Sequence, residues 1–200
     1  MALKVEVPIL KISNFGLIKQ AARLAKKFHA GQVRKGPKGE AFYHHPRRVC
    51  KSYLAFKNKS ISGVIAALCH DLVEDTPLSL EDLEEMFGAD VRQIVFNLTK
   101  PGNVSSEEYA KKISRWNLES KKIKLCDIED NILGSREIPL ERRMRMLVRW
   151  KKYLDKLEHN PPSGGSEMEL EFVKKWDAVN ELHAEEWNRL KPGINFLRNG

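Results

Sequence analysis

One histidine and three carboxylates crowd the end of an apolar segment, at residues 67 to 77 (ALCHDLVEDTP). They are His70, Asp71, Glu74 and Asp75. Residues 61 to 68 upstream carry no charge and read as a buried helix, which the Thr-Pro pair would end. Ionised carboxylates at the edge of a core repel one another and lose hydration, so they need water or a cation.

The spacing of these four residues divides them into two couples. Residues four apart share one face of a helix, so His70 pairs with Glu74 and Asp71 pairs with Asp75. The His-Asp step is fit for a metal ion, and the Glu-Asp step one turn later is fit for proton transfer. An adjacent His-Asp pair taken alone more often marks a capped helix end or a surface ion pair.

Two other segments offer matching groups. In KLCDIEDN, at residues 124 to 131, Asp127 and Asn131 lie four apart, and His45 stands directly before Pro46. The candidate metal ligands are therefore His45, His70, Asp71 and Asp127. Two imidazoles and two carboxylates suit Mn, Fe or Zn better than a thiolate-seeking ion, and they leave room for water.

The elements that must position these groups are helical almost throughout. We expect His45 to be an extended residue just before a helix that Pro46 opens, and Ser79 with Asp82 to form a capping box. No strand pattern of comparable length competes. The predicted helices span about residues 14–30, 46–56, 61–76, 79–86, 89–99, 107–118, 120–133 and 138–158, with a last amphipathic helix around 173–190.

The domain organisation follows from these elements. The chain of 200 residues is long enough to bury a core, and we expect a single compact all-α domain over residues 1–158. The composition NPPSGGS predicts a flexible linker at 159–166, followed by a C-terminal helical appendage at 167–200. These last helices are a candidate surface for homo-oligomer formation.

Composition indicates which classes of partner the protein can bind. Lys and Arg number 35 against 27 Asp and Glu, and a formal charge of +8 favours polyanions. Aromatic residues do not interleave with a basic patch, so we expect a small nucleotide rather than nucleic acid. No apolar run approaches the ~20 residues of a membrane span, and no secretory leader is visible, so we expect a cytoplasmic protein without a membrane partner. The 3 cysteines lack metal spacing and fit a reducing compartment.

Several separated motifs resemble the hydrolase domain of the Rel/Spo family of alarmone enzymes, within the HD superfamily of metal-dependent phosphohydrolases. The segment from His70 to Lys100 carries most of the resemblance. Further matches follow the family's order: HAGQVRK at 29–35, HHP at 44–46 and KLCDIEDN at 124–131. Together they cover about residues 18 to 135.

The resemblance implies an all-α HD-domain fold and removal of the 3′-pyrophosphate from guanosine 3′,5′-bis(diphosphate), ppGpp, with Mn²⁺. It implies a metal held by His45, His70, Asp71 and Asp127. Glu74 and Asp75 would position and deprotonate the attacking water. Arg34 and Lys35 would engage the nucleotide, and Asn131 would contact its ribose or phosphate region. Because the sequence leaves no room for a synthetase domain, it looks like a stand-alone small alarmone hydrolase.

Departures from the family pattern leave alternatives open. The connection at residues 36–44 is longer than usual, and Asp130 stands where the family commonly has His. His44 is a rival to His45, and residues beyond Gly134 either complete the core, cover the cleft or form a dimer face. The alternatives are an HD phosphohydrolase of another nucleotide and a binding module without turnover. Glu74 and Asp75 argue against the second, because a binder has little use for acids beside phosphate.

Overall fold

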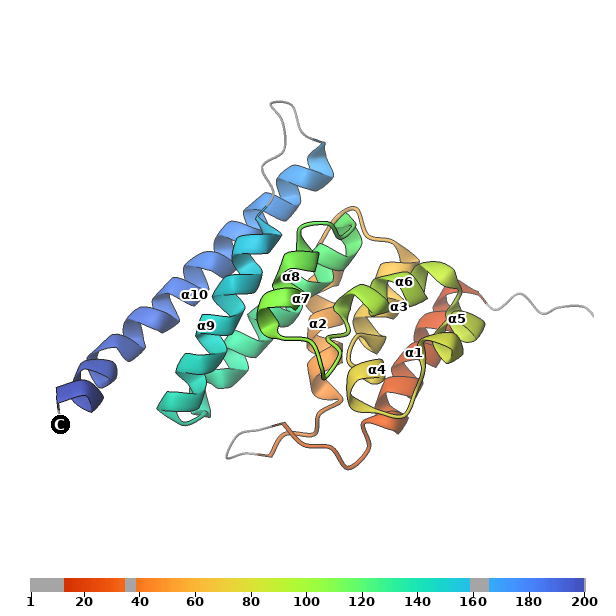
Figure 1. Ribbon diagram of the computed structural model, residues 1–200. Helices are drawn as coiled ribbons and strands as arrows, with labels where there is room; N and C mark the ends of the chain where they lie inside the picture. Colours follow the sequence, from red (N-terminus) through yellow and green to blue (C-terminus); the bar gives the residue numbers. More distant parts are fainter. Residues whose placement is uncertain (1–12, 35–38, 159–165, 200) are drawn as a thin grey trace, which may run out of the picture.

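The computed structural model describes residues 13–34, 39–158 and 166–199, with side chains to residue 190. These residues contain an isolated antiparallel bridge between Val33 and Ala41 but no strand, which confirms the expected all-α fold. The helices (Figure 1) are α1 (Asn14–Phe28), α2 (His44–Leu54), α3 (Ile61–Cys69), α4 (Leu72–Asp75), α5 (Leu80–Phe87), α6 (Ala89–Leu98), α7 (Ser106–Ile113), α8 (Leu118–Gly134), the 3-10 turn η1 (Ser135–Glu137), α9 (Leu140–Leu157) and α10 (Glu167–Asn199).

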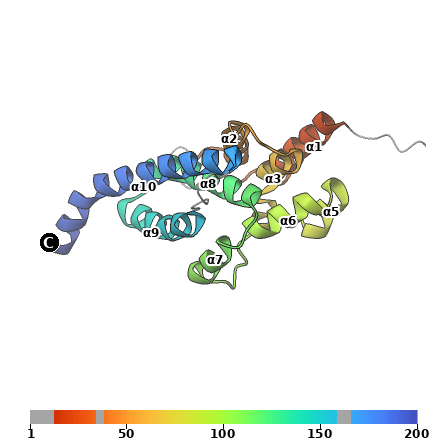
Figure 2. The same ribbon diagram turned by 90° about the horizontal axis from the view of Figure 1, so that it is seen from above.

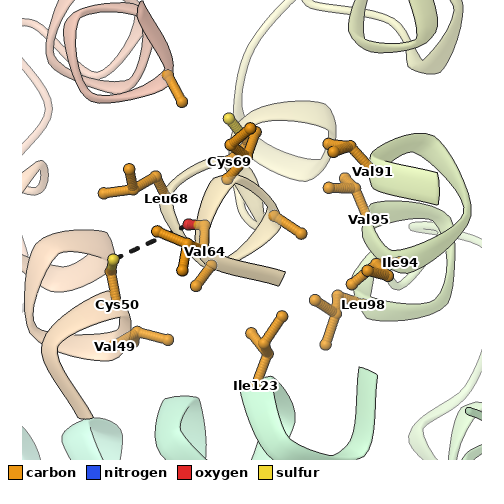
Figure 3. Close-up of a cluster of buried hydrophobic side chains, with 14 of the residues drawn as sticks. Val49, Cys50, Val64, Leu68, Cys69, Val91, Ile94, Val95, Leu98 and Ile123 are labelled. Carbon is orange, nitrogen blue, oxygen red and sulfur yellow. Dashed lines mark hydrogen bonds between the residues drawn. The ribbon is translucent and has the colours of Figure 1, made fainter. Parts of the chain in front are cut away.

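Helix α8 separates two hydrophobic cores. The first core joins α1 to α6, and Figure 3 shows side chains of α2, α3 and α6 meeting Ile123 of α8. The second core joins α7, α9 and α10 to the opposite side of α8, through Leu125, Ile128 and Ile132. A helix that is apolar on both sides is buried by neighbours on both sides, so α8 can carry polar groups to the centre of the molecule.

Helix α10 packs along α8 and α9, as Figures 1 and 2 show. Phe172 and Val179 are buried in the second core, and the Trp176 indole N–H donates to the Leu154 carbonyl at 2.9 Å. Glu186 is fully buried and is held by Arg136 and Arg143. The linker expected at 159–166 falls outside the described residues except for its last position.

The expected helix over residues 61–76 is divided. Helix α3 ends at Cys69, and α4 begins at Leu72. The His70 Nδ1 lies 3.0 Å from the Ala67 carbonyl oxygen, the acceptor that a continuous helix would offer to the Asp71 N–H. The side chain of His70 therefore ends the helix with a hydrogen bond of its own.

The expectation that His45 is extended was wrong. His45 lies in the first turn of α2, and its N–H donates to the Phe42 carbonyl at 2.9 Å. Pro46 is the third helical residue rather than the first. This is tolerated because the first four N–H groups of a helix have no partner within it. The capping box of Ser79 and Asp82 at the start of α5 is confirmed.

Among the described helices, none combines the length and the apolar composition that crossing a membrane requires.

Candidate active site

Four side chains converge where α2, the α3–α4 junction and α8 meet. They form what we call the His-Asp cluster: His45, His70, Asp71 and Asp127. His45 Nε2 lies 3.1 Å from Asp127 Oδ1 and 3.4 Å from Asp71 Oδ2. His70 Nε2 lies 3.2 Å from Asp71 Oδ2 and 3.8 Å from Asp127 Oδ1. Single ligand atoms of His45, His70 and Asp127 all lie within 4.8 Å of one another, a spacing compatible with one ion.

The donor set fits a divalent cation. His70 Nδ1 faces the Ala67 carbonyl and donates to it, so in the neutral ring the lone pair is on Nε2. That Nε2 is buried and has no hydrogen-bond partner among the described residues, although carboxylate oxygens lie beside it. A lone pair facing carboxylates is unfavourable unless a proton or a metal ion lies between them.

The electrostatics of the His-Asp cluster favour positive charge. Burial alone would lower the pKa of His45, but hydrogen bonds to Asp127, Asp130 and Asp71 raise it to about 9. His44, the rival candidate, is only half-buried and stacks against Tyr43 with a centroid distance of 4.1 Å. The geometry therefore places His45, not His44, in the cluster.

Neighbours on α8 hold Asp127 in place. Its carboxylate accepts hydrogen bonds from the Lys124 ammonium at 2.8 Å and from the Asn131 amide at 2.5 Å. Asn131 also accepts a hydrogen bond from Arg34 at 2.9 Å. The residue expected to contact the nucleotide thus lies between a candidate metal ligand and a candidate phosphate-binding arginine.

The His-Asp cluster opens into a cavity of about 530 Å³, within the range of small-molecule sites. The cavity lining includes the predicted Arg34, Glu74, Asp75 and Asn131. It also includes a group on one face of α9 that we call the α9 wall: Met146, Arg149, Trp150 and Tyr153. Lys100 and Lys124 add positive charge, so the cavity suits an anionic ligand that also has an aromatic or apolar part.

The two acids of α4 lie beside the His-Asp cluster and are open to the cavity. The backbone N–H of Lys100 donates to Glu74 Oε2 at 2.9 Å, which orients that carboxylate. Partial desolvation, with the negative charges of Asp71 and Glu74, raises the pKa of Asp75 to about 6. A carboxylate with this pKa is mostly ionised at neutral pH yet accepts a proton more readily than an ordinary aspartate. Lys35 lies outside the described residues.

Comparison with known proteins identifies the family of the chain. A family model described as "HD domain" matches residues 21–130. The chain belongs to the HD domain family. A relative from Xenopus tropicalis, named guanosine-3′,5′-bis(diphosphate) 3′-pyrophosphohydrolase MESH1, is 33% identical over 132 residues, which are 63% of this HD protein and 72% of the relative.

A relative from Aquifex aeolicus with the same enzyme name, but without the MESH1 label, is 30% identical over 188 residues. The match covers 90% of this HD protein but 26% of the relative, so the chain spans about a quarter of that longer protein. The solved structure of a metazoan orthologue of SpoT, described as hydrolysing ppGpp, aligns with a TM-score of 0.69 at 27% identity. That alignment covers 82% of this HD protein and 93% of the other chain.

Motifs in the sequence did not point to the α9 wall. Residues beyond Gly134 match no motif of the resembled family, and covering the cleft is one of the three roles that the sequence leaves open for them. A usable signal was nevertheless present. Positions 146, 149, 150 and 153 follow the i, i+3, i+4, i+7 spacing of one helix face, and this face mixes an arginine with aromatic residues. The structure places that face on the cavity, so α9 both completes the core and lines the cleft.

Proposed function

We propose that this HD domain is a metal-dependent phosphohydrolase that removes the 3′-pyrophosphate from guanosine 3′,5′-bis(diphosphate)-like nucleotides. The observation that carries the proposal is the buried His70 Nε2, which faces Asp71 and Asp127, two carboxylates that line the cavity together with several cations. The substrate class is taken from the names of the relatives, and the size and charge of the cavity support it.

His45, His70, Asp71 and Asp127 would hold the ion. Their mixed nitrogen and oxygen donors suit Mn²⁺, Fe²⁺ or Zn²⁺, and the choice of Mn²⁺ rests on the resemblance to the Rel/Spo hydrolases. When bound, a divalent ion offsets charge on the phosphoryl oxygens and supplies hydroxide near neutral pH. Two carboxylate ligands balance the charge of such an ion, so Glu74 and Asp75 add a surplus of negative charge. The cavity cations Arg34, Lys100 and Arg149 offset this surplus when an anionic substrate enters.

Of the two acids, we assign the role of proton acceptor to Asp75. Its raised pKa suits it to take a proton from the attacking water, and Glu74, anchored by the Lys100 N–H, orients that water. Water attacks the phosphorus bonded to the ribose 3′-oxygen, the bond between them breaks, and pyrophosphate departs. The 3′-oxygen receives a proton, so the products are the 5′-diphosphate and pyrophosphate.

Arg34 and Asn131 line the cavity next to the His-Asp cluster, where the 3′-pyrophosphate would lie. The planar guanidinium of Arg34 is suited to fork onto phosphate oxygens. Trp150 and Tyr153 of the α9 wall offer apolar surface for the nucleoside.

A metal and product assay tests this function. The purified protein is stripped with a chelator, reloaded with Mn²⁺, Zn²⁺ or Fe²⁺, and given ppGpp, nucleoside monophosphates and adenine analogues of ppGpp. We expect pyrophosphate release from ppGpp, fastest with Mn²⁺. Orthophosphate release from monophosphates would assign another substrate, and tight nucleotide binding without products would assign a binding module.

A further inference from the structure

A hydrogen-bonded network behind the His-Asp cluster, buried at Asp130 and half-exposed at Arg48 and Glu40, connects the candidate metal ligands to the segment that carries Arg34. We infer that Asp130 is a positioning residue that holds His45 and Arg34 in place at once, supported by Arg48 and Glu40. The inference rests on the proposed metal site and adds residues to it.

Asp130 is only 9% exposed, and both its oxygens are engaged. Oδ2 lies 2.7 Å from His45 Nδ1 and accepts from Arg34 Nη1 at 3.1 Å. Oδ1 accepts from the Arg48 Nε at 2.5 Å. A carboxylate hydrogen-bonded to one ring nitrogen of a histidine determines which nitrogen faces the metal. Asp130 therefore directs His45 Nε2 toward Asp71 and Asp127.

Arg48 and Glu40 connect Asp130 to the nucleotide-facing segment. Arg48 lies one turn after His45 on α2, and its two terminal nitrogens donate to the Glu40 carboxylate at 2.5 and 2.9 Å. The Arg34 N–H donates to the Glu40 carbonyl at 2.8 Å, across the short bridge between Val33 and Ala41. The segment that carries Arg34 is thus fastened to α2 and to Asp130 by side chains that also support His45.

This network explains why an aspartate at position 130 can replace the histidine that is common in the resembled family. A neutral histidine has one acceptor nitrogen, whereas a carboxylate offers about four acceptor sites. Only the carboxylate accepts from His45, Arg34 and Arg48 together. A histidine at position 130 would leave the half-buried Arg48 Nε–H facing a side chain with too few acceptors.

The test compares two carboxylate-to-amide changes on adjacent residues of α8. Asp130→Asn keeps the shape but replaces one acceptor oxygen with a donor nitrogen, so His45 and Arg48 cannot both keep an acceptor. Glu129→Gln makes the same change one residue away, where the carboxylate faces Ser52 and Lys175 instead. Mn²⁺ affinity is measured by titration, using the electron paramagnetic resonance signal of free Mn²⁺.

We expect Asp130→Asn to weaken Mn²⁺ binding ~10-fold or more, as loss of a hydrogen-bond partner of a metal ligand commonly does. We expect Glu129→Gln to stay within about twofold of the unchanged protein. Arg34→Met separates the two tasks of Asp130: it should raise the KM for ppGpp without changing Mn²⁺ affinity, whereas Asp130→Asn should change both.

Arg48→Met provides a second route if Asp130→Asn does not fold, with folding checked by circular dichroism in chelator. In Arg48→Met, His45 keeps its hydrogen bond to Asp130, but Asp130 loses the arginine that supports it. Mn²⁺ binding should therefore be weakened, though less than in Asp130→Asn. A folded Asp130→Asn or Arg48→Met protein that binds Mn²⁺ as tightly as Glu129→Gln would overturn the inference. Failure of the unchanged protein to bind Mn²⁺ would overturn the proposed metal site as well.

Discussion

The His-Asp cluster and the α9 wall border the same cavity but are built by different kinds of contact. In the cluster, polar atoms of three helical segments lie within 3.1 to 3.8 Å of one another. In the α9 wall, Trp150 and Tyr153 belong to the second core and line the cavity at the same time. The first region depends on particular atoms, whereas the second depends on a helix being packed in the right place. Substitutions in the His-Asp cluster should therefore abolish metal binding or turnover. Substitutions in or beneath the α9 wall should change stability or substrate affinity.

The largest effect should come from Asp71→Ala, which removes a carboxylate of the His-Asp cluster. We expect loss of both Mn²⁺ retention and turnover, because the remaining donors leave the charge of a divalent ion unbalanced. Metal content after gel filtration and pyrophosphate release measure the two effects. Asp177→Ala, an exposed carboxylate on α10, is the control. An Asp71→Ala protein that retains a full equivalent of metal would contradict the assignment.

Phe172→Ala tests whether α10 stabilises the half of the molecule that carries the α9 wall. Phe172 is fully buried in the second core, so its truncation should lower the free energy of unfolding by about 3–5 kcal/mol. Leu170 on the same helix is 50% exposed, and Leu170→Ala should stay within about 0.5 kcal/mol. Urea unfolding followed by circular dichroism measures both. Equal stability of the two variants would show that α10 contributes little to this core.

Glu74→Ala should separate turnover from metal binding. The four candidate ligands remain, so Mn²⁺ affinity should be kept, whereas turnover should slow by ~10²-fold or more because the water loses its orienting carboxylate. Single-turnover kinetics with ppGpp, together with an Mn²⁺ titration, test this. Glu85→Ala supplies an exposed acid as control. Unchanged turnover would contradict the proposed role of Glu74 in orienting the water.

Arg149→Ala should give the smallest effect and sharpen the contrast between the two regions. We expect the KM for ppGpp to rise ~10-fold, which corresponds to loss of one charge-assisted hydrogen bond, with Mn²⁺ affinity unchanged. Arg145 lies on the same helix, is exposed and pairs with Glu141 at 3.6 Å, so Arg145→Ala is the matched control. A loss of Mn²⁺ affinity in Arg149→Ala would mean that the α9 wall also shapes the His-Asp cluster.

Local patterns predicted most helices well because apolar periodicity and caps act within a few residues. The Ser79–Asp82 capping box is an example. The same reasoning failed at two residues whose side chains enter the His-Asp cluster. His45 is helical despite the following proline, and the His70 ring interrupts a segment that is apolar enough to continue as a helix. Both exceptions occur in the His-Asp cluster, where packing positions side chains that local preference would place otherwise.

By itself, the sequence determined the helical class, the HD resemblance and the residue types of the His-Asp cluster, because each of these is a matter of period, order or chemistry along the chain. Only the tertiary structure decided which ring nitrogen faces the carboxylates, that Asp130 joins His45 to Arg34, and that α9 borders the cavity. Those features depend on how α2, α8 and α9 pack across long sequence separations, and no local pattern specifies the distances between them.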